Sequence, residues 1–268
     1  HSLVAGAGFR RLREAGVAVE VGVLAGAVEA QLAGFLARHR RGRGRLRVKL
    51  AMSLDGRTAM ASGESRWTTG SPARRDVQRL RAESCAILTG VGTVLADDCS
   101  LTVRDGELDG KLLPAPRRRA ARVVLDSRLR TPPGAAVLDG LQPTLLVHDA
   151  AAAVPEGLEH TARLPLARDA APGAGLPLAG VMDALAAREC NEILLESGPT
   201  LAGEVLRAGL ADELIVYMAP KLLGSDARPL VTLSLAEMAS AIGLEPIEQR
   251  RIGRDLRLRF AVPGTPSV

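Results

Sequence analysis

The chain has 268 residues, of which 47% are hydrophobic and 24% are charged, as in an ordinary soluble globular protein. Its longest uncharged stretches, 84–96 and 170–182, are shorter than the roughly 20 apolar residues of a transmembrane helix, so we expect no membrane contact. The three cysteines form no C-x-x-C pair, which excludes a disulfide framework or a cysteine-based zinc site and fits a reducing cytoplasm.

The excess of basic charge does not indicate a nucleic-acid partner. The formal net charge is +5, and much of the excess lies in two runs, Arg38–Arg47 and Arg117–Arg122. Because aromatic residues make up only 2% of the chain, it lacks the stacking platforms of a single-strand binder, and we expect no nucleic acid. The runs are solvated connecting segments or basic patches that attract small phosphorylated ligands.

The first 44 residues differ in pattern from the rest. They predict a helix over Phe9–Ala15, an alternating strand over Val17–Val23 and a second helix over Gly26–Arg40. The first residues do not form a positively charged start followed by an apolar run and a cleavage site, so we expect no signal peptide. The basic, glycine-containing run that follows marks a boundary, so we predict a short unit over 1–44 and a main domain over 45–268.

Beyond residue 45, short β-rich runs alternate with helical ones, which is typical of an α/β domain with a largely parallel sheet. We predict strand Arg47–Met52, helix Pro72–Ser84, strands Ala86–Thr89, Arg122–Asp126 and Thr144–His148, helix Leu178–Glu189, strand Glu192–Leu195, helix Thr200–Ala208, and strands Glu213–Ala219, Pro246–Ile252 and Leu256–Val262. The last two flank a turn and form a β-hairpin, hence an antiparallel edge. The Ala-, Pro- and Gly-rich stretch 150–179 is a surface loop or spacer.

The most informative segment is a strand that ends in small residues and leads into a helix. It is Leu194–Gly203, where Pro199 suits the first turn of a helix because its missing N–H would have no partner there. Small residues let a ligand approach the backbone, and the N–H groups of a first helical turn favour a phosphate. The alternative is an ordinary strand-to-helix turn. Neither a dinucleotide-binding G-x-G-x-x-G after a strand nor a P-loop is present.

A lysine occurs at position 49 of an otherwise apolar strand. Lys49, Ala51 and Ser53 share one face of this strand, because alternate residues of a strand face opposite sides. A buried lysine is costly unless it interacts with something, so Lys49 either lies at a sheet edge with its amino group in solvent or reaches a ligand. Trp67, the only tryptophan, is either a core residue or lines a cofactor beside a Gly- and Ser-rich loop.

A third segment, Thr89–Asp98, has two glycines directly after a predicted strand, where the backbone can approach a ligand closely. Arg81 and Arg104 are fork-shaped donors suited to a phosphate, although an arginine on a helix surface is usually only solvated. Asp97 and Asp98 have no third carboxylate or histidine at coordinating spacing, so capping or polar contact is favoured over a metal pair.

Missing motifs narrow the chemistry further. The four histidines have no acidic partner at motif spacing, and no G-x-S-x-G elbow occurs. A hydrolase or a zinc enzyme is therefore disfavoured, we expect no metal, and chemistry carried by a cofactor is the favoured interpretation.

Taken together, these segments closely resemble the reductase domain of the bifunctional riboflavin-biosynthesis deaminase-reductase. The likeness runs from about Arg47 to Val262 in the same motif order, through 49–58, 63–67, 89–98, 101–104, 196–201, 212–217 and 219–224. The resemblance implies a dihydrofolate-reductase-like α/β fold: a central, mostly parallel sheet with a C-terminal antiparallel hairpin and flanking helices. It also implies NADPH-dependent reduction of the ribosyl group of 5-amino-6-(5-phosphoribosylamino)uracil to 5-amino-6-(5-phosphoribitylamino)uracil, by hydride transfer to C1′.

The resemblance implies roles for individual residues. Contacts to the NADPH cofactor are expected at Ala51, Trp67, Thr93, Asp97, Ser127, and, around its phosphates, Gly198, Pro199, Thr200, Leu201, Ala202, Gly203 and Glu204. Contacts to the phosphorylated pyrimidine substrate are expected at Ser65, Arg81, Leu101, Arg104 and Glu196, where the arginines suit the 5′-phosphate and the carboxylate can accept hydrogen bonds. Lys49 is the candidate catalytic residue, which assists ring opening or protonates the ribose ring oxygen.

The sequence departs from that family at its N-terminal end. The zinc-dependent deaminase signature of the family, His-x-Glu with a Pro-Cys and a second Cys, is absent, and 4–40 resembles only the final portion of a deaminase, so we expect no deaminase activity. Family members are dimers or larger, which implies a homodimer or higher homo-oligomer. Two alternatives stay open: another dihydrofolate-reductase-like reductase of a pterin or pyrimidine, and a non-catalytic nucleotide-binding or dimerisation module.

Overall fold

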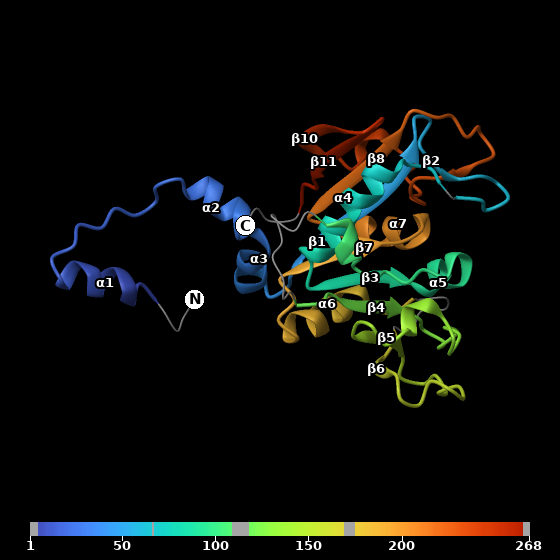
Figure 1. Ribbon diagram of the computed structural model, residues 1–268, viewed down its shortest axis with the longest axis horizontal. Helices are drawn as coiled ribbons and strands as arrows, with labels where there is room; N and C mark the ends of the chain where they lie inside the picture. Colours follow the sequence, from blue (N-terminus) through green and yellow to red (C-terminus); the bar gives the residue numbers. More distant parts are fainter. Residues whose placement is uncertain (1–4, 66, 109–117, 169–174, 265–268) are drawn as a thin grey trace.

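The computed structural model of the protein describes residues 5–65, 67–108, 118–168 and 175–264 (Figure 1). The helices in this part of the chain are α1 (Ala7–Glu14), α2 (Ala25–Gln31), α3 (Ala33–Arg41), α4 (Ser71–Ala82), α5 (Val91–Asp97), α6 (Leu178–Ala187) and α7 (Pro199–Arg207). The strands are β1 (Arg45–Ser53), β2 (Arg57–Ala59), β3 (Ala86–Gly90), β4 (Ala121–Leu125), β5 (Thr144–Asp149), β6 (Ala162–Leu166), β7 (Glu192–Glu196), β8 (Glu213–Ala219), β9 (Arg228–Pro229), β10 (Glu245–Ile252) and β11 (Asp255–Ala261).

The main sheet is mostly parallel. Its strand order is β10-β11-β8-β1-β7-β3-β4-β5-β6, and the strands from β8 to β6 pair parallel to one another. At one end, β11 pairs antiparallel with β8 and forms a hairpin with β10. Gly253 in the hairpin turn has a φ of 65°, a left-handed conformation that glycine adopts without strain. The predicted fold class, with a parallel sheet and a C-terminal antiparallel hairpin, is confirmed.

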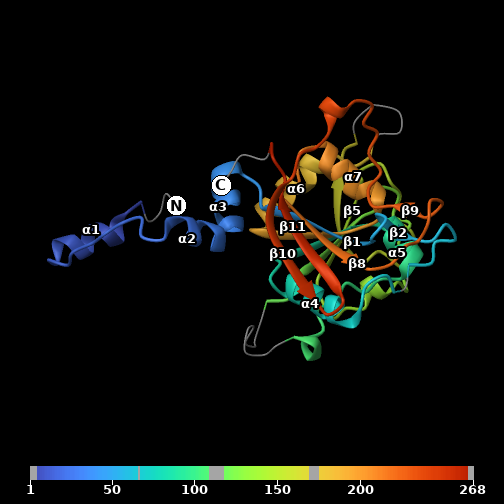
Figure 2. The same cartoon turned by 90° about the horizontal axis from the view of Figure 1, so that it is seen from above.

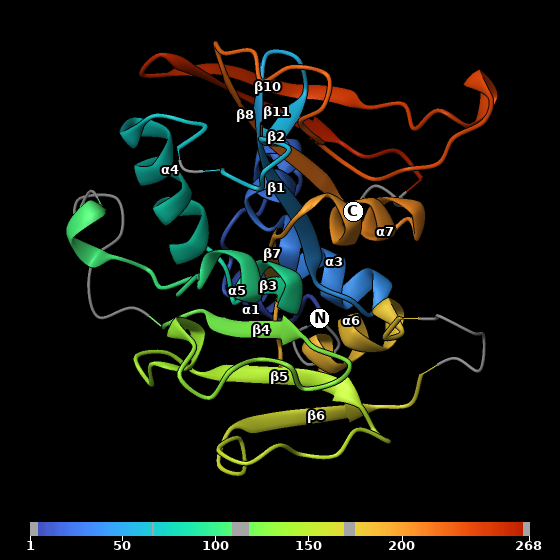
Figure 3. The same cartoon turned by 90° about the vertical axis from the view of Figure 1, so that its right-hand side faces the viewer.

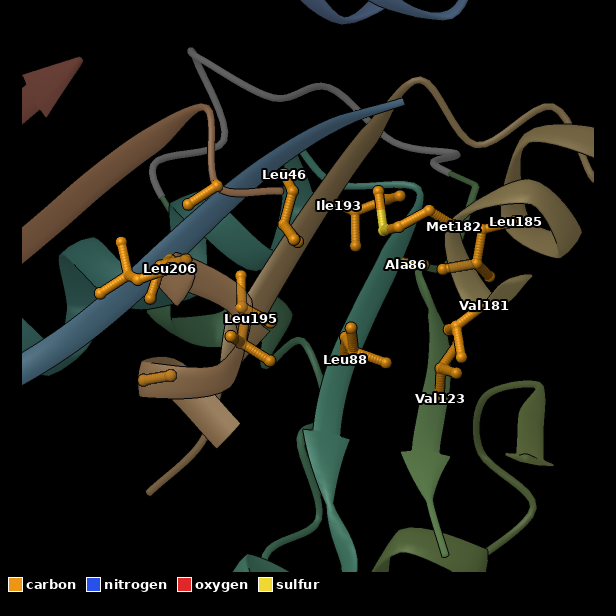
Figure 4. Close-up of a cluster of buried hydrophobic side chains, with 14 of the residues drawn as sticks. Leu46, Ala86, Leu88, Val123, Val181, Met182, Leu185, Ile193, Leu195 and Leu206 are labelled. Carbon is orange, nitrogen blue, oxygen red and sulfur yellow. The ribbon is translucent and has the colours of Figure 1, made fainter. Parts of the chain in front are cut away.

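Helices cover both faces of the sheet (Figure 3). The helices α6 and α7 pack on one face through the largest apolar cluster, which Figure 4 shows, with Leu46, Leu88 and Ile193 from three strands among its members. The helices α4 and α5 lie on the opposite face, where two smaller clusters hold them. Burial of such apolar faces is the main favourable term in folding.

The two faces of the central strands differ in chemistry. On β1, Leu46, Val48 and Leu50 are at most 3% exposed and point into the α6/α7 cluster. The alternate residues Arg47 and Lys49 therefore point to the α4 side, where they meet carboxylates. One face of the sheet is thus apolar, and the other carries charged side chains.

The topology brings the carboxyl ends of β1, β7 and β3 together near the centre of the sheet. The chain leaves β1 through α4 and returns in β3, and β7 later fills the position between them. In open α/β sheets, ligands bind beyond the carboxyl ends of strands at such a change in strand order. The carboxyl ends of β1, β7 and β3 are therefore the place where the fold favours a functional site.

The N-terminal residues differ from their prediction. Val17–Val23 form no strand, because this mostly exposed segment lies with α1 and α2 away from the sheet, where no strand is available to pair with it (Figures 1 and 2). The helix predicted over Gly26–Arg40 is two helices, α2 and α3, which meet at Leu32. Neither α1 nor α2 has a buried residue.

A strand also lies where a loop is predicted. The stretch 150–179 contains β6, which pairs parallel with β5 at the edge of the sheet, so the prediction of a loop or spacer is wrong for 162–166. Pro165 within β6 is compatible with this place, because proline lacks the N–H that an inner strand needs. Residues 169–174 of the stretch lie outside the described residues.

Arginines of the first basic run are held in ion pairs. Arg41 and Arg43 contact the two carboxylate oxygens of Asp212 at 2.7 and 2.8 Å, and Arg45 lies 2.6 Å from the fully buried Glu213. Both interpretations of the run, a solvated connection and a patch for phosphorylated ligands, are wrong for these side chains. They fasten the start of β1 to the residues that lead into β8.

In the second basic run, one arginine is held in a buried ion pair and another in an exposed one. Arg122 is fully buried and lies 2.7 Å from Asp139, and Arg119 lies 2.7 Å from Asp105. Arg117 lies outside the described residues. In the described part of the chain, no helix is both long and apolar enough to cross a membrane.

Candidate active site

Three charged side chains meet where the carboxyl end of β7 lies beside the middle of β1. The parallel register sets Lys49 of β1 beside Glu196, the last residue of β7, and their Nζ and Oε2 atoms are 3.5 Å apart. From α4, Arg81 donates to both oxygens of Glu196, at 2.5 Å from Nε and 3.0 Å from Nη2. The two cations thus share one carboxylate at the place where the topology favours a ligand.

The charges of this cluster stabilise one another. Burial alone would raise the pKa of Glu196, but the charges of Arg81 and Lys49 and the hydrogen bonds from both hold it at about 2. Burial would lower the pKa of Arg81, yet the carboxylate of Glu196 raises it. The nearby Cys99 thiol has a pKa raised to about 11, first by burial and then by Glu196 and Asp97, so it stays protonated and is a poor nucleophile.

Lys49 does not lie at a sheet edge. Its strand runs between β8 and β7, and its side chain is only 19% exposed. The edge interpretation is therefore wrong, and the amino group stands in the interior beside a carboxylate. A lysine placed in this way can give or take a proton at a bound ligand.

Trp67 lies on the surface in the connection between β2 and α4. It is 60% exposed, so the interpretation as a core residue is wrong. The guanidinium carbon of Arg74 lies 4.3 Å from the centre of the indole ring, a cation–π contact, and Lys221 donates from Nζ to the Trp67 carbonyl at 2.8 Å. Ser65 accepts a hydrogen bond at its carbonyl from the Thr68 N–H at 3.1 Å.

The start of α7 has the properties of an anion site. Gly198 is the N-cap residue, it is exposed, no side chain caps the helix, and a Cβ at Gly198 would meet no atom within 4 Å. The first amides of any helix have no partner within the helix, and the helix dipole favours negative charge there. With Pro199, Thr200 and Leu201 next to this open space, the residues fit the phosphates of a dinucleotide cofactor.

The rest of the predicted phosphate segment is turned away from that space. Ala202 is fully buried in the α6/α7 cluster, and a Cβ at Gly203 would lie 2.1 Å from the carbonyl oxygen of Thr232. Glu204 forms an ion pair with Arg207 one turn along the helix. The first turn of α7 is therefore the part of this segment that borders the open space.

Other predicted contacts lie toward the same, carboxyl ends of the parallel strands. Thr93 and Asp97 belong to α5, which follows β3, and Ala51 belongs to β1. Ser127 follows β4, and its carbonyl accepts the Asp149 N–H at 3.1 Å. These residues therefore belong to β1 or to the segments that directly follow β3 and β4.

The predicted substrate contacts are unequal in exposure. Leu101 is only 3% exposed and packs beside Ile87, so its side chain is part of the protein core. The donors of Arg81 are engaged by Glu196 and by the Thr102 carbonyl, at 3.1 Å from Nη1. The Arg104 side chain is 59% exposed and pairs with Glu107 at 3.0 Å.

The polar contact predicted for the two adjacent aspartates is confirmed at one of them. Asp98 accepts the backbone N–H of Ala136 at 2.8 Å, at the start of the short 3-10 turn Ala136–Leu138. No group of three or more His, Cys, Asp or Glu side chains that could hold a metal ion occurs among the described residues.

Sequence reasoning missed the role of Asp55. This aspartate accepts a hydrogen bond from Ser53 and from the backbone N–H groups of Leu223 and Gly224, at 3.1 and 2.8 Å. These hydrogen bonds, with that from Ser53 the strongest, lower its pKa to about 2 although burial opposes them. The Asp-Gly pair after a strand signals a turn, but not the partner that lies far along the chain.

Comparison with known proteins points to one family. The model of the RibD C-terminal domain matches residues 45–258. Over 264 residues the chain is 45% identical to the riboflavin biosynthesis protein RibD of Escherichia coli (strain K12), covering 96% of this chain and 70% of that relative. A solved structure of Acinetobacter baumannii RibD, form 1, matches with a TM-score of 0.83 and 36% identity over 97% of this chain and 69% of that one.

A more distant structure shares the fold. It is a diaminohydroxyphosphoribosylaminopyrimidine deaminase/5-amino-6-(5-phosphoribosylamino)uracil reductase from Thermotoga maritima, with a TM-score of 0.79 at 22% identity. The match covers 95% of this chain and 67% of that one. This chain therefore spans between 67% and 70% of the length of these three relatives.

Proposed function

The chain belongs to the RibD C-terminal domain family and is a pyrimidine reductase of riboflavin biosynthesis, and on that premise we propose that it reduces the ribosyl group of 5-amino-6-(5-phosphoribosylamino)uracil with hydride from NADPH. The product would be 5-amino-6-(5-phosphoribitylamino)uracil. The observation that carries the proposal is the cluster of Lys49, Glu196 and Arg81 at the carboxyl end of β7, beside the neighbouring central strand β1. It is a buried charged group in a place where the fold favours ligands, beside a helix start suited to phosphate.

Lys49 handles the proton in this proposal. C1′ can accept a hydride only after the ribose ring has opened to an imine, and opening requires a proton on the ring oxygen. The Nζ atom of Lys49 is held 3.5 Å from the Glu196 carboxylate, which keeps the amino group beside the carboxyl end of β7. Glu196, itself fixed by Arg81, orients the donor and has a second lone pair for a substrate hydroxyl or N–H.

The exposed start of α7 and the Trp67 indole are proposed to hold the cofactor. Backbone N–H groups of Thr200 and Leu201 would bind its phosphates, and the open space at Gly198 admits them. The further contacts that the family resemblance implies are Ala51, Thr93, Asp97, Ser127, Ala202, Gly203 and Glu204.

Arg104 is the proposed partner of the substrate 5′-phosphate. Arg81 is already bound to Glu196 through two nitrogens, whereas the Arg104 side chain is exposed and pairs with Glu107 over a 3.0 Å contact. An exposed guanidinium can take a phosphate without breaking a buried ion pair. Ser65 stays a proposed substrate contact.

The test is oxidation of NADPH at 340 nm with the purified chain and 5-amino-6-(5-phosphoribosylamino)uracil, with NADH and dihydrofolate as parallel controls. Turnover confined to the phosphoribosylaminouracil is expected. Lys49→Met should lower kcat by about 10²-fold or more, because a positioned proton donor contributes that much. The exposed change Arg130→Gln should leave kcat unchanged. Normal kcat in Lys49→Met, or turnover of dihydrofolate alone, would contradict the proposal.

Two further expectations concern deaminase activity and the oligomeric state. No deaminase activity is expected, because the sequence lacks the zinc-binding signature of that reaction. A homodimer or higher homo-oligomer is proposed, and the long edge strand β10, exposed over most of its length, is the surface most open to pairing. Light scattering on the eluting protein gives the mass that decides between one chain and two.

A further inference from the structure

The exposed Trp67 is held by polar contacts rather than by packing. Its indole is 60% exposed, so little apolar burial fixes where the ring stands. Arg74 covers one face of the ring at 4.3 Å and is itself anchored by donating to the Thr69 carbonyl at 2.8 Å. The backbone of Trp67 is fixed by the 2.8 Å hydrogen bond from Lys221 Nζ to its carbonyl.

The loop that carries Lys221 is hydrogen-bonded to the turn after β1. The N–H of Leu54 donates to the Lys221 carbonyl at 2.8 Å. Next to it, the Asp55 carboxylate accepts the N–H groups of Leu223 and Gly224 at 3.1 and 2.8 Å. Asp55 thus connects this loop to the end of β1, because its carboxylate also accepts a hydrogen bond from Ser53.

These contacts form a continuous connection from β1 to Trp67. The strand carries Lys49 and Ala51, its following turn carries Asp55, Asp55 holds the loop of Lys221, and Lys221 holds Trp67. The connection therefore runs through a loop that is more than 150 residues from both Asp55 and Trp67 in sequence. It sets the indole in a defined place relative to the strand that bears the candidate catalytic lysine.

We propose that Asp55, Lys221 and Arg74 are positioning residues that fix the Trp67 indole against β1 and thereby set the affinity for the nicotinamide cofactor. The inference rests on the proposed function, in which Trp67 lines the cofactor. None of the three residues is assigned a contact with the cofactor or with the reacting atoms. Their effect passes through Trp67, so it should appear in the KM for NADPH and not in kcat.

The sole tryptophan offers a readout that needs no cofactor. Because Trp67 is the only indole in the chain, fluorescence excited at wavelengths that tyrosine does not absorb reports on this residue alone. In the free protein, Lys221→Met and Asp55→Asn should increase quenching by acrylamide and shift the emission maximum to the red. Arg74→Met should change the emission intensity, because it removes the cation over the ring. Lys221→Arg, which restores a donor, should recover much of the native signal.

The second readout is steady-state kinetics with the phosphoribosylaminouracil. Lys221→Met should raise the KM for NADPH about three- to tenfold with kcat within about twofold, as expected for the loss of one hydrogen bond. Leu222→Ala is the matched control in the same loop: this leucine is 72% exposed, and its truncation should change neither fluorescence nor KM. Thermal melting of each variant identifies any that unfolds, and Lys221→Met, at an exposed position, is the one expected to fold normally.

The outcomes separate this inference from the proposed function. Unchanged Trp67 fluorescence in both Lys221→Met and Asp55→Asn would overturn the positioning role. So would altered fluorescence with a native KM, if Trp67→Phe itself raises the KM for NADPH. A native KM in Trp67→Phe would instead remove Trp67 from the cofactor site, which contradicts the proposed function at that residue and the inference with it. Joint changes in fluorescence and KM, reversed in Lys221→Arg, support both.

Discussion

At the scale of single residues, the candidate site depends on one carboxylate between two cations. Glu196 is 8% exposed, and removal of either cation would leave a buried charge without full compensation. The arrangement positions Lys49 but also makes the local structure sensitive to the protonation of Glu196. The carboxylate oxygens of Glu196 therefore determine both the position of Lys49 and the local stability of the fold.

This coupling predicts a pH dependence of stability. The folded pKa of Glu196 is lowered from 4.5 to about 2, so its ionised form contributes stability that is complete above pH 4.5 and is lost as the pH falls through about 2. The difference in unfolding free energy between the native protein and Glu196→Gln should therefore be largest above pH 4.5 and shrink toward pH 2. Urea titrations at several pH values measure it.

The control for that series is Glu237→Gln, at an exposed position in the loop before β10. Its unfolding free energy should follow that of the native protein at every pH. If the difference for Glu196→Gln were the same at pH 3 and pH 6, the lowered pKa of Glu196 would be contradicted.

Sequence alone identified the reactive residue types but not all of their surroundings. Lys49 could be predicted because a charged side chain in an apolar strand requires a partner. The hydrogen bonds of Asp55 could not be predicted, since its partners Leu223 and Gly224 come from a loop far along the chain. Nor could the surroundings of Ala202 and Gly203, because the core around Ala202 and the contact of Gly203 with Thr232 come from other parts of the chain.

At the scale of elements, α7 is held against the chain that follows β9. Gly203 lies so close to the backbone of Thr232 that a side chain there has no room, and the Thr232 N–H donates to the Pro199 carbonyl at 3.0 Å. The helix start that is proposed to bind phosphate is therefore fixed by a backbone contact on its other side.

A substitution at this contact tests the idea. Gly203→Ala should lower the unfolding free energy by about 1–3 kcal/mol, because the new methyl group must displace backbone rather than a flexible side chain. The KM for NADPH should rise as the start of α7 shifts. Gly180→Ala, in α6 where a Cβ would meet only ordinary contacts at 3.6 Å or more, is the matched control and should not destabilise the protein. Equal melting temperatures for the two variants would contradict this account.

The predictions of helices and strands are confirmed where the spacing of apolar residues coincides with packing against neighbouring elements. The central strands and α4, α6 and α7 are present within a few residues of their predicted bounds, because apolar runs and helical spacing agree with burial there. Val17–Val23 has a strand-like period but no strand to pair with. The edge strand β6 was missed because its proline and its alanine-rich flanks resemble a loop.

At the scale of the whole molecule, the N-terminal segment joins the body through α3. The helices α1 and α2 have no buried residue, whereas α3 buries Gly34 and Ala37 and is followed by the ion pairs of Arg41 and Arg43 with Asp212. Asp212 also accepts the N–H of Leu46 at 2.7 Å. One aspartate thus ties the segment to the first strand of the sheet.

Asp212→Asn should therefore loosen the junction. We expect trypsin to cleave near Arg41 and Arg43 faster than in the native protein, while kcat stays within about twofold because the site lies at the opposite ends of the strands. Asp226→Asn, an exposed aspartate in the loop before β9, is the control and should be cleaved at the native rate. Native cleavage kinetics in Asp212→Asn would show that α3 alone holds the junction.

The different chemistry of the two sheet faces has a consequence for how the gene can vary. Along β1, positions 46, 48 and 50 need only volume and apolarity, so related aliphatic residues can replace one another there. Positions 47 and 49 need a particular charge at a particular distance, so few replacements keep their ion pairs. A saturation library scored for growth without riboflavin should therefore show tolerance that alternates residue by residue along this strand.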